Sequence, residues 1–131
     1  MTTSSDFYAV WTPRVQALLR IVVAVLFFQH GIAKLFPGAG GNAVPLMSMY
    51  GAAAMLELVG GFLIIIGLFT RPAAFILSGE MAFAYFIGHA PHGFNPMANK
   101  GELAVIYCFV FLFFAVAGAG AFSVDAARKK A

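Results

Sequence analysis

Four long apolar segments constrain the fold of this chain more than any other feature. A helix rises ~1.5 Å per residue, so about 20 apolar residues are needed to cross a ~30 Å hydrocarbon layer. Charged residues make up only 10% of the 131 residues, where a soluble domain has roughly 25%, so the chain lacks the charge to cover a surface in water. The sequence therefore predicts an all-α integral membrane protein with four transmembrane helices, at residues 15–36, 46–69, 72–88 and 103–122.

The segments between the apolar runs predict how the helices are connected. Residues 38–45 and 89–100 are rich in glycine, proline and asparagine, which favour loops. Only Thr70 and Arg71 separate the second run from the third. Short connections join neighbouring antiparallel helices. We therefore expect a single domain over residues 1–131, folded as an up-down-up-down four-helix bundle.

The positions of lysine and arginine predict the orientation of the bundle, because cytoplasmic loops carry an excess of these residues. Lys34 and Lys100 lie on one side of the predicted membrane, and the other six basic residues lie on the opposite side. We therefore expect a multi-pass protein of the bacterial plasma (inner) membrane, with both termini cytoplasmic and the two longer loops outside. The six residues of the cytoplasmic side are Arg14, Arg20, Arg71, Arg128, Lys129 and Lys130.

The first apolar run has a second interpretation, a cleaved signal peptide. Arg20 followed by Ile21–Phe28 has the charged and apolar regions of such a peptide. The apolar stretch continues to Phe36, however, and cleavage would leave only three spans around the acidic residues of the others. We therefore expect the first run to be a retained span.

Two further features limit the kinds of function. Cys108 is the only cysteine, so no disulfide forms within the chain, and its apolar neighbours predict a buried, inert thiol. The basic tail at residues 128–130 is explained by membrane orientation, so we expect no nucleic-acid partner.

Ionisable residues within the apolar runs are the candidate functional residues, because a charge at the bilayer centre costs about 2.5–3.5 kcal/mol unless it finds a partner. At ~1.5 Å per residue, Glu57 lies about 16 Å and Glu80 about 12 Å from the start of its run, close to the midplane. His30 lies about 9 Å below the outer end of the first run, with Lys34 one turn above it. Small residues around Glu57 predict that its side chain points into the bundle, whereas the inward placement of Glu80 rests on the cost alone.

These residues have a structural and a functional interpretation. In the structural one, Glu57 and Glu80 are protonated or hydrogen-bonded contacts between helices, and Lys34 extends to the membrane surface. For Glu102, the dipole of the fourth helix alone explains an acidic residue at its start. In the functional one, a carboxyl group and a histidine exchange protons in a polar pocket open to the outside. The candidate pocket residues are His30, Lys34, Glu57, Glu80, His89 and Glu102.

The residues near such a pocket bear on two kinds of ligand, a metal ion and a flat ring. His89 and His92 lie three residues apart, but Pro91 between them breaks the helical spacing and no cysteine ligand is available, so we expect no metal site. Aromatic residues are frequent in the fourth run and include Tyr107. They fit lipid contact and core packing, and they also suit a flat ring ligand such as a quinone.

Several short motifs, in a fixed order over residues 14–125, resemble the DoxX family of small four-helix membrane proteins. Lys100 departs from the family pattern, because a small residue usually stands there, and it adds a cation at the mouth of the expected pocket. The motifs are His30-Gly31-x-x-Lys34-Leu35-Phe36, Glu57-x-x-Gly60-Gly61 with Gly67-Leu68-x-Thr70-Arg71-x-Ala73-Ala74, His89-x-Pro91-x-Gly93-Phe94 with Gly101-Glu102, and Gly120-x-x-Ser123-x-Asp125.

The resemblance implies a membrane component of oxidoreductase systems, such as quinone-linked sulfur oxidation, although many family members have no defined activity. No motif for a flavin, haem or iron–sulfur cluster is evident, so the residues themselves indicate no cofactor, and a quinone belongs to the redox interpretation alone. We expect a redox-linked accessory in the lipid bilayer with soluble or membrane redox enzymes as partners. Whether it is itself an enzyme stays open. The alternatives are a binding or transport protein for a small solute or anion, which would need a homo-oligomer for transport, and a scaffold that recruits soluble redox enzymes through its basic tail.

Overall fold

A computed structural model of the chain describes residues 3–36, 38 and 45–130, so most of the predicted 38–45 loop lies outside the described residues. All regular structure in the described part is helical. The four long helices are α1 (Ser4–Leu35), α2 (Met49–Ile66), α3 (Thr70–Ala84) and α5 (Glu102–Ala117). The short elements are the π-helix η2 (Tyr85–His89), the 3-10 turn η3 (Ala90–His92), α4 (Pro96–Asn99) and α6 (Val124–Lys130).

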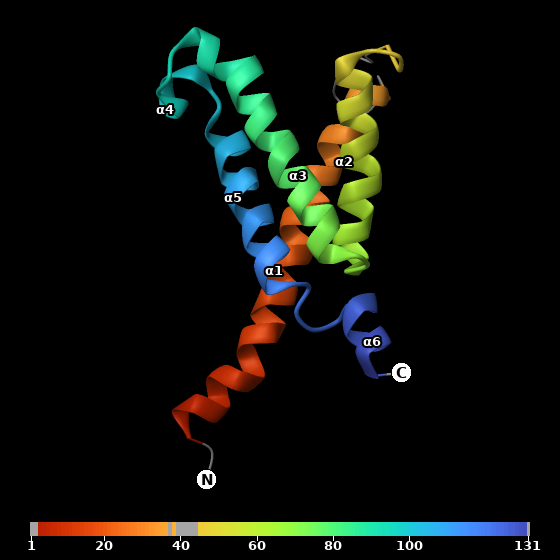
Figure 1. Cartoon of the computed structure of the whole chain (residues 1–131), viewed down its shortest axis with the longest axis vertical. Coiled ribbons are helices and arrows are strands. Elements are labelled where there is room, and N and C mark those ends of the chain that lie inside the picture. Colours follow the sequence, from red (N-terminus) through yellow and green to blue (C-terminus); the bar gives the residue numbers. More distant parts are fainter. Residues whose placement is uncertain (1–2, 37, 39–44, 131) are drawn as a thin grey trace.

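The four long helices form two pairs (Figure 1). α1 packs along α2 and α3 packs along α5, whereas α2 and α3 contact each other less extensively. In Figure 1 the two pairs converge towards the lower end, where α1 begins and α6 lies, and they diverge towards the upper end. We call the lower end the terminal end, and the upper end, which carries residues 85–101, the loop end.

Large apolar side chains hold the two pairs together where they converge. Phe27 of α1 lies edge-on against Tyr107 and Phe111 of α5, with ring centroids 5.2 and 4.8 Å away. Such aromatic contacts add to the hydrophobic stabilisation of burying the rings. The buried core consists of Ala24, Phe27, Ile64, Ala73, Ala74, Leu77, Met81, Tyr107, Phe111 and Phe114.

The outward faces of the helices are apolar, as contact with lipid requires. Val59, Phe75 and Phe109, from three different helices, are more than half exposed. In the described part of the chain, three helical segments are long and apolar enough to cross a membrane: Ser4–Leu35, Met49–Ile66 and Thr70–His92. α5 has 16 residues and extends only about 24 Å at ~1.5 Å per residue. The chain is therefore a helical membrane protein, while its up-down-up-down crossing by four helices with cytoplasmic termini stays a prediction.

α1 begins at Ser4, well before the predicted start at residue 15. A capping box explains the early start: the Thr3 side chain accepts from the Asp6 amide at 3.2 Å, and the Asp6 carboxylate accepts from the Thr3 amide at 2.9 Å. Pro13 lies inside the helix although proline lacks the amide that helical bonding needs. The Pro13 carbonyl accepts a hydrogen bond from the Ala121 amide at 3.0 Å, and this bond ties α1 to the last part of the chain.

Arg20, one of the six basic residues expected on the cytoplasmic side, is fully buried. Its guanidinium donates to the carbonyl of Ala119, to that of Ala121 at 3.1 Å and to that of Phe122 at 2.8 Å. A buried charge is tolerated when hydrogen bonds replace its water, and these three carbonyls do so for Nη1 and Nη2, while Nε has no partner among the described groups. Arg20 therefore binds the segment of residues 118–122, which we call the carbonyl segment.

The carbonyl segment corrects the predicted end of the fourth span, because α5 ends at Ala117 and not at Phe122. Helical residues would direct their carbonyls along the helix axis and not towards Arg20. Three residues with left-handed backbone angles turn the chain instead: Gly118, Gly120 and Phe122, with φ values of 85°, 76° and 50°.

Asp125 caps the start of α3 from a distant part of the chain. Its Oδ1 accepts from the Phe69 amide and its Oδ2 from the Thr70 amide, both at 3.0 Å. No side chain near the start of α3 provides this cap. Burial opposes ionisation of Asp125, but these hydrogen bonds and the charge of Arg128 outweigh it and hold its pKa below the ordinary 3.8.

The cap formed by Asp125 predicts a pH-dependent contribution to stability. Because its folded-state pKa lies below the unfolded value of about 3.8, ionised Asp125 stabilises the fold above that value, and the contribution is lost as the pH falls through the folded-state pKa. Asp125→Ala should lower the free energy of unfolding at neutral pH by about 0.5–2 kcal/mol, the range for a lost helix cap, and weaken the acid dependence. Thermal unfolding in detergent across acidic and neutral pH measures both effects. Glu102→Gln, which removes an exposed carboxyl, should change neither, and an equal effect of both variants would contradict the role of Asp125.

The close contact of α1 with α2 predicts a steric limit at Gly31. A Cβ atom there would lie 2.9 Å from Leu58 Cγ and 3.1 Å from the Ala54 carbonyl oxygen, closer than packed atoms approach. Gly31→Ala should therefore destabilise the protein by about 1–3 kcal/mol, the usual cost of overpacking. Gly79→Ala is the matched control, because a Cβ at Gly79 would meet nothing within 4 Å. A lower thermal unfolding midpoint for Gly31→Ala alone is expected, and equal midpoints would show that the two helices separate freely.

Candidate functional site

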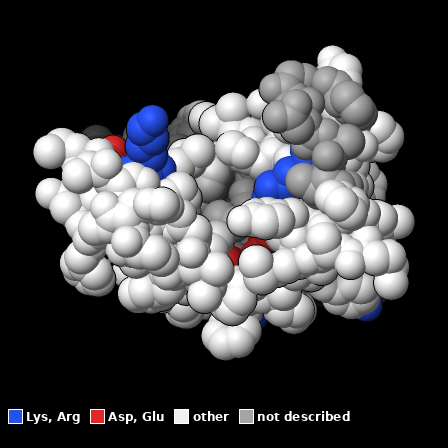
Figure 2. Space-filling view, turned by 90° about the horizontal axis from the view of Figure 1, so that it is seen from above, with Lys and Arg blue, Asp and Glu red and all other residues white. Residues whose placement is uncertain are grey.

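A cavity of about 290 Å³ lies between the two helix pairs on the side of the loop end. Every long helix contributes to its wall, so the site depends on how the pairs are placed. Figure 2 looks down on the loop end and shows a hollow in a mostly uncharged surface, with basic and acidic side chains visible inside it. The cavity is lined by Phe27, His30, Lys34, Glu57, Met81, Ala84, His89, Lys100, Leu103, Ala104 and Tyr107.

An ion pair between α1 and α2 forms one wall of this cavity. Lys34 Nζ lies 2.5 Å from Glu57 Oε1, and the exposed fractions of the two side chains are 31% and 2%. The predicted inward direction of Glu57 is confirmed, because Ala54, Gly60 and Gly61 of the same helix face are buried with it. Oε2 of Glu57 is buried and has no hydrogen-bond partner among the described groups.

Glu80 lies next to this pair but does not line the cavity. Its carboxyl group interacts with that of Glu57 across the contact between α3 and α2. Both Glu80 oxygens are buried, and neither has a hydrogen-bond partner within the described ranges. One ammonium group therefore accompanies two carboxyl groups in an apolar environment.

Aromatic rings line the cavity next to the ion pair. The Tyr107 ring is buried and lies edge-on to His30, with ring centroids 6.0 Å apart. It also stacks against Phe111 at 6.0 Å with an angle of 17° between the rings, and Phe27 packs against both. His30 itself is exposed at the cavity wall. The site thus combines charged groups with a rigid aromatic surface.

A hydrogen-bonded turn holds His89 at the mouth of the cavity. Asn99 is buried and donates from Nδ2 to Tyr85 Oη at 3.2 Å and to the Gly93 carbonyl at 2.6 Å. His89 Nδ1 lies 3.1 Å from the Asn99 carbonyl oxygen, and its ring stacks on that of Tyr85. The same turn places Lys100, whose left-handed φ of 63° follows α4, among the lining residues. The contact with the Asn99 carbonyl therefore orients the His89 ring, and the turn sets the backbone position of Lys100.

The structure brings four of the six candidate pocket residues together and leaves two out. His30, Lys34, Glu57 and His89 line one cavity, and Glu80 lies behind Glu57. Glu102 is an exposed residue in the first turn of α5 and is not among the residues that line the cavity, so the structure does not bring it together with the other candidates. The favourable position of an acid at a helix N-terminus explains it without a ligand.

Two other residues considered for chemistry lie elsewhere. His92 is exposed on η3, and in the described parts of the chain no three histidine, cysteine or acidic residues gather closely enough to hold a metal ion. Cys108 is half-buried in α5, and its carbonyl accepts from Ser78 Oγ at 2.7 Å. The sequence indicated neither the role of Asn99 nor the wall formed by Phe27, because both depend on contacts between distant segments.

Relatives of this chain carry no functional description. A protein of Haemophilus influenzae described as uncharacterized is 51% identical over 122 residues, covering 88% of this chain and 91% of the relative. A second uncharacterized protein of the same organism is 31% identical over 125 residues, covering 86% of this chain and 82% of the relative. No solved structure matches the chain.

A family model does match the chain, and it supports the resemblance seen in the motifs. The model named DoxX matches residues 15–90, which include α2, α3 and most of α1. This range contains His30, Lys34, Glu57 and His89 of the cavity wall. The chain therefore belongs to the DoxX family.

Proposed function

We propose that this DoxX family membrane protein is a redox-linked accessory that binds a quinone, or a similarly small oxidised ring, in the cavity at the loop end. The observation that carries the proposal is the Lys34–Glu57 pair, which sits beside an aromatic wall with one Glu57 oxygen left without a partner among the described groups. A quinone ring offers carbonyl oxygens to the cations and a flat apolar face to Tyr107.

The volume of the cavity supports a small ligand. Ligand pockets typically have volumes of about 300–1,000 Å³, so the 290 Å³ found here suits a single ring rather than an extended substrate.

The charged groups support proton exchange at the bound ring. Reduction of a quinone to a quinol takes up two electrons and two protons. Lys34 and His30 can donate hydrogen bonds to the ring oxygens, where negative charge develops during reduction. Glu57 and Glu80 are two carboxyl groups balanced by one ammonium, so a proton on the carboxyl pair makes the cluster neutral and is available for transfer. The pair would pass one proton at a time and regain it from water at the cavity mouth, so that two transfers complete the quinol. No electron-carrying cofactor motif is evident in the chain, so the electrons would come from a partner oxidoreductase.

The basic residues at the mouth of the cavity favour a second candidate function, which is the binding or transport of a small anion. Lys100 and His89 stand at this mouth, and Lys34 and His30 lie on its walls, whereas Glu57 is the only acidic residue among the lining residues. Basic side chains at a cavity entrance attract anions by electrostatic steering. We favour the quinone because the Glu57 carboxyl is buried beside Lys34 and would repel an anion that reached this lysine.

The membrane and its orientation complete the proposal. The excess of basic residues near the terminal end supports a bacterial plasma (inner) membrane with this end in the cytoplasm. The cavity would then open towards the outer leaflet, where a membrane quinone is accessible.

Quinone binding predicts a ligand-dependent stabilisation that the cavity residues control. A short-chain benzoquinone should raise the thermal unfolding midpoint of the protein in detergent. Glu57→Gln should weaken quinone binding about tenfold or more, because it removes the charged partner of Lys34 and the proton-exchanging group. His30→Ala should weaken it less, by about fivefold, since His30 is exposed and offers one hydrogen bond.

His92→Ala is the matched control for His30→Ala, because His92 is exposed and does not line the cavity. It should bind quinone as the unaltered protein does. A protein whose midpoint does not move at saturating quinone would refute the proposal. Stabilisation by sulfate in place of quinone, lost in His89→Ala and Lys100→Gln, would support anion binding instead.

A further inference from the structure

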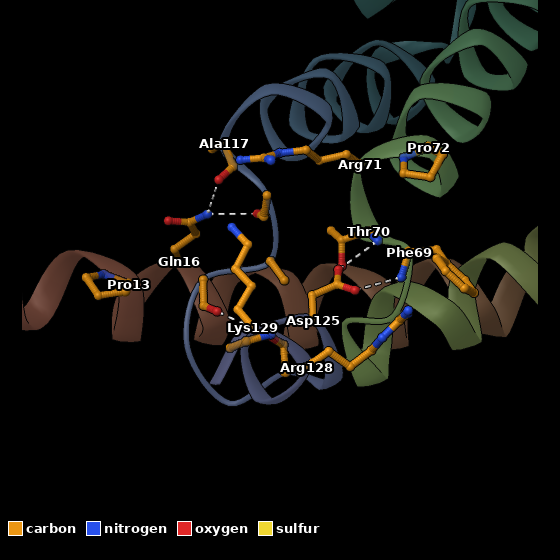
Figure 3. A pocket seen from close by; sticks show the side chains of 15 residues that line it. Pro13, Gln16, Phe69, Thr70, Arg71, Pro72, Ala117, Asp125, Arg128 and Lys129 are labelled. Carbon is orange, nitrogen blue, oxygen red and sulfur yellow. Dashed lines mark hydrogen bonds between the residues drawn. The ribbon is translucent and has the colours of Figure 1, made fainter. Parts of the chain in front are cut away.

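A second and larger cavity, of about 720 Å³, lies at the terminal end of the protein (Figure 3). It is far from the quinone site in the fold and shares no residue with it. Its walls come from Pro13 and Gln16 of α1, from the start of α3 and from α6. The carbonyl segment forms the remaining wall, so the hydrogen bonds of Arg20 give this cavity its shape.

Three basic side chains line this cavity against one acidic side chain. The Arg71 guanidinium lies over Gly118, where a Cβ atom would meet its Nη2 at 3.2 Å. In Figure 3, Arg71 extends from α3 across the cavity, and Lys129 extends from α6 towards the same region. Arg128 is directed the other way, with its guanidinium carbon 5.2 Å from the centre of the Phe69 ring. Two cations thus face the interior of the cavity.

The acidic residue does not neutralise these two cations. Both oxygens of Asp125 already accept backbone hydrogen bonds at the start of α3, 3.0 Å from the Phe69 and Thr70 amides. Within the described residues, neither Arg71 nor Lys129 forms an ion pair. The cavity therefore carries a net positive charge that its own walls leave unbalanced.

We propose that this cavity binds a phosphate group, supplied by the headgroup of an anionic phospholipid. Arg71 is the second residue of a helix long and apolar enough to span the membrane, which places its guanidinium at the level of the headgroups. Basic pockets between transmembrane helices bind anionic headgroups at this level. Arginine matches the geometry of two phosphate oxygens, and lysine adds a point charge. The exposed ring of Phe69 lies beside the opening, where an acyl chain can pack.

The test compares lipid binding of the purified full chain in detergent. Phosphatidylglycerol and phosphatidylcholine in mixed micelles are the two probes, and native mass spectrometry counts the lipid that stays bound. The full chain should retain phosphatidylglycerol in preference to phosphatidylcholine. Losing one basic residue costs about fivefold in affinity for an anionic surface, so Arg71→Gln with Lys129→Gln should weaken phosphatidylglycerol binding roughly 25-fold. Both side chains are exposed, so the double variant should keep its thermal unfolding midpoint without lipid.

Arg14→Gln is the matched control, because it removes an exposed basic side chain that packs on Trp11 and does not line the cavity. It should bind phosphatidylglycerol within about twofold of the unaltered chain. A loss as large as that of the double variant would overturn the proposal, since general surface charge would then explain the binding. Equal retention of the two lipids by the full chain would overturn it as well.

Inorganic phosphate distinguishes the sources of the phosphate group. If phosphate at millimolar concentration stabilises the full chain but not the double variant, Arg71 and Lys129 bind a soluble phosphate, and the lipid is not the source of the phosphate group. Binding of phosphatidylglycerol that free phosphate does not displace would assign the site to lipid. Capture of a soluble redox enzyme by the full chain, lost in the double variant while lipid retention is unchanged, would refute the lipid site and favour a protein partner.

Discussion

A charge inside the membrane must be satisfied by the protein itself, and the rest of this structure depends on that constraint. Arg20 meets it with three backbone carbonyls of the carbonyl segment, and Glu57 meets it with Lys34. The first arrangement fixes the end of the chain against α1, and the second joins α1 to α2. Both interactions join separate segments of the chain. Removing one partner would leave the other as a buried charge without compensation, which is costly.

The two arrangements differ in the buried polar atoms that they leave without a hydrogen-bond partner. The carbonyls around Arg20 are backbone groups held by left-handed turns, so this interaction defines shape and builds the wall of the cavity at the terminal end. Arg20 leaves one donor, its Nε, without a partner among the described groups, whereas the Lys34–Glu57 pair leaves carboxyl oxygens without one, a single oxygen of Glu57 and both of the neighbouring Glu80. Buried polar atoms without partners are costly, and they persist where a ligand or a proton completes them. Because of this difference, we assign a structural role to Arg20 and its carbonyls, and a chemical role to the cluster of Lys34, Glu57 and Glu80.

The sequence predicts features that follow from local periodicity and from the cost of burial. The apolar runs, the inward direction of Glu57 and the shared position of His30 and Lys34 are all local, and the structure agrees with them. The partners of Arg20 could not be predicted, because the first of them lies 99 residues later in a segment that leaves helical geometry. The capping role of Asp125 depends in the same way on the position of α6. Glu102 is the opposite case, because the dipole of α5 alone explains an acidic residue at the start of this helix and no distant contact is needed.

The most direct test of the account replaces the charged pair at the proposed quinone site with apolar residues of similar size. Buried ion pairs often contribute little to stability, and apolar replacement is commonly neutral or stabilising by about 1–4 kcal/mol. If Lys34 and Glu57 serve a ligand, the Lys34→Met/Glu57→Leu double variant should unfold at the same or a higher temperature in detergent and should lose the stabilisation that quinone confers. A double variant that unfolds at a clearly lower temperature and still binds quinone like the unaltered protein would contradict the account, because the pair would then serve only to hold the helices together.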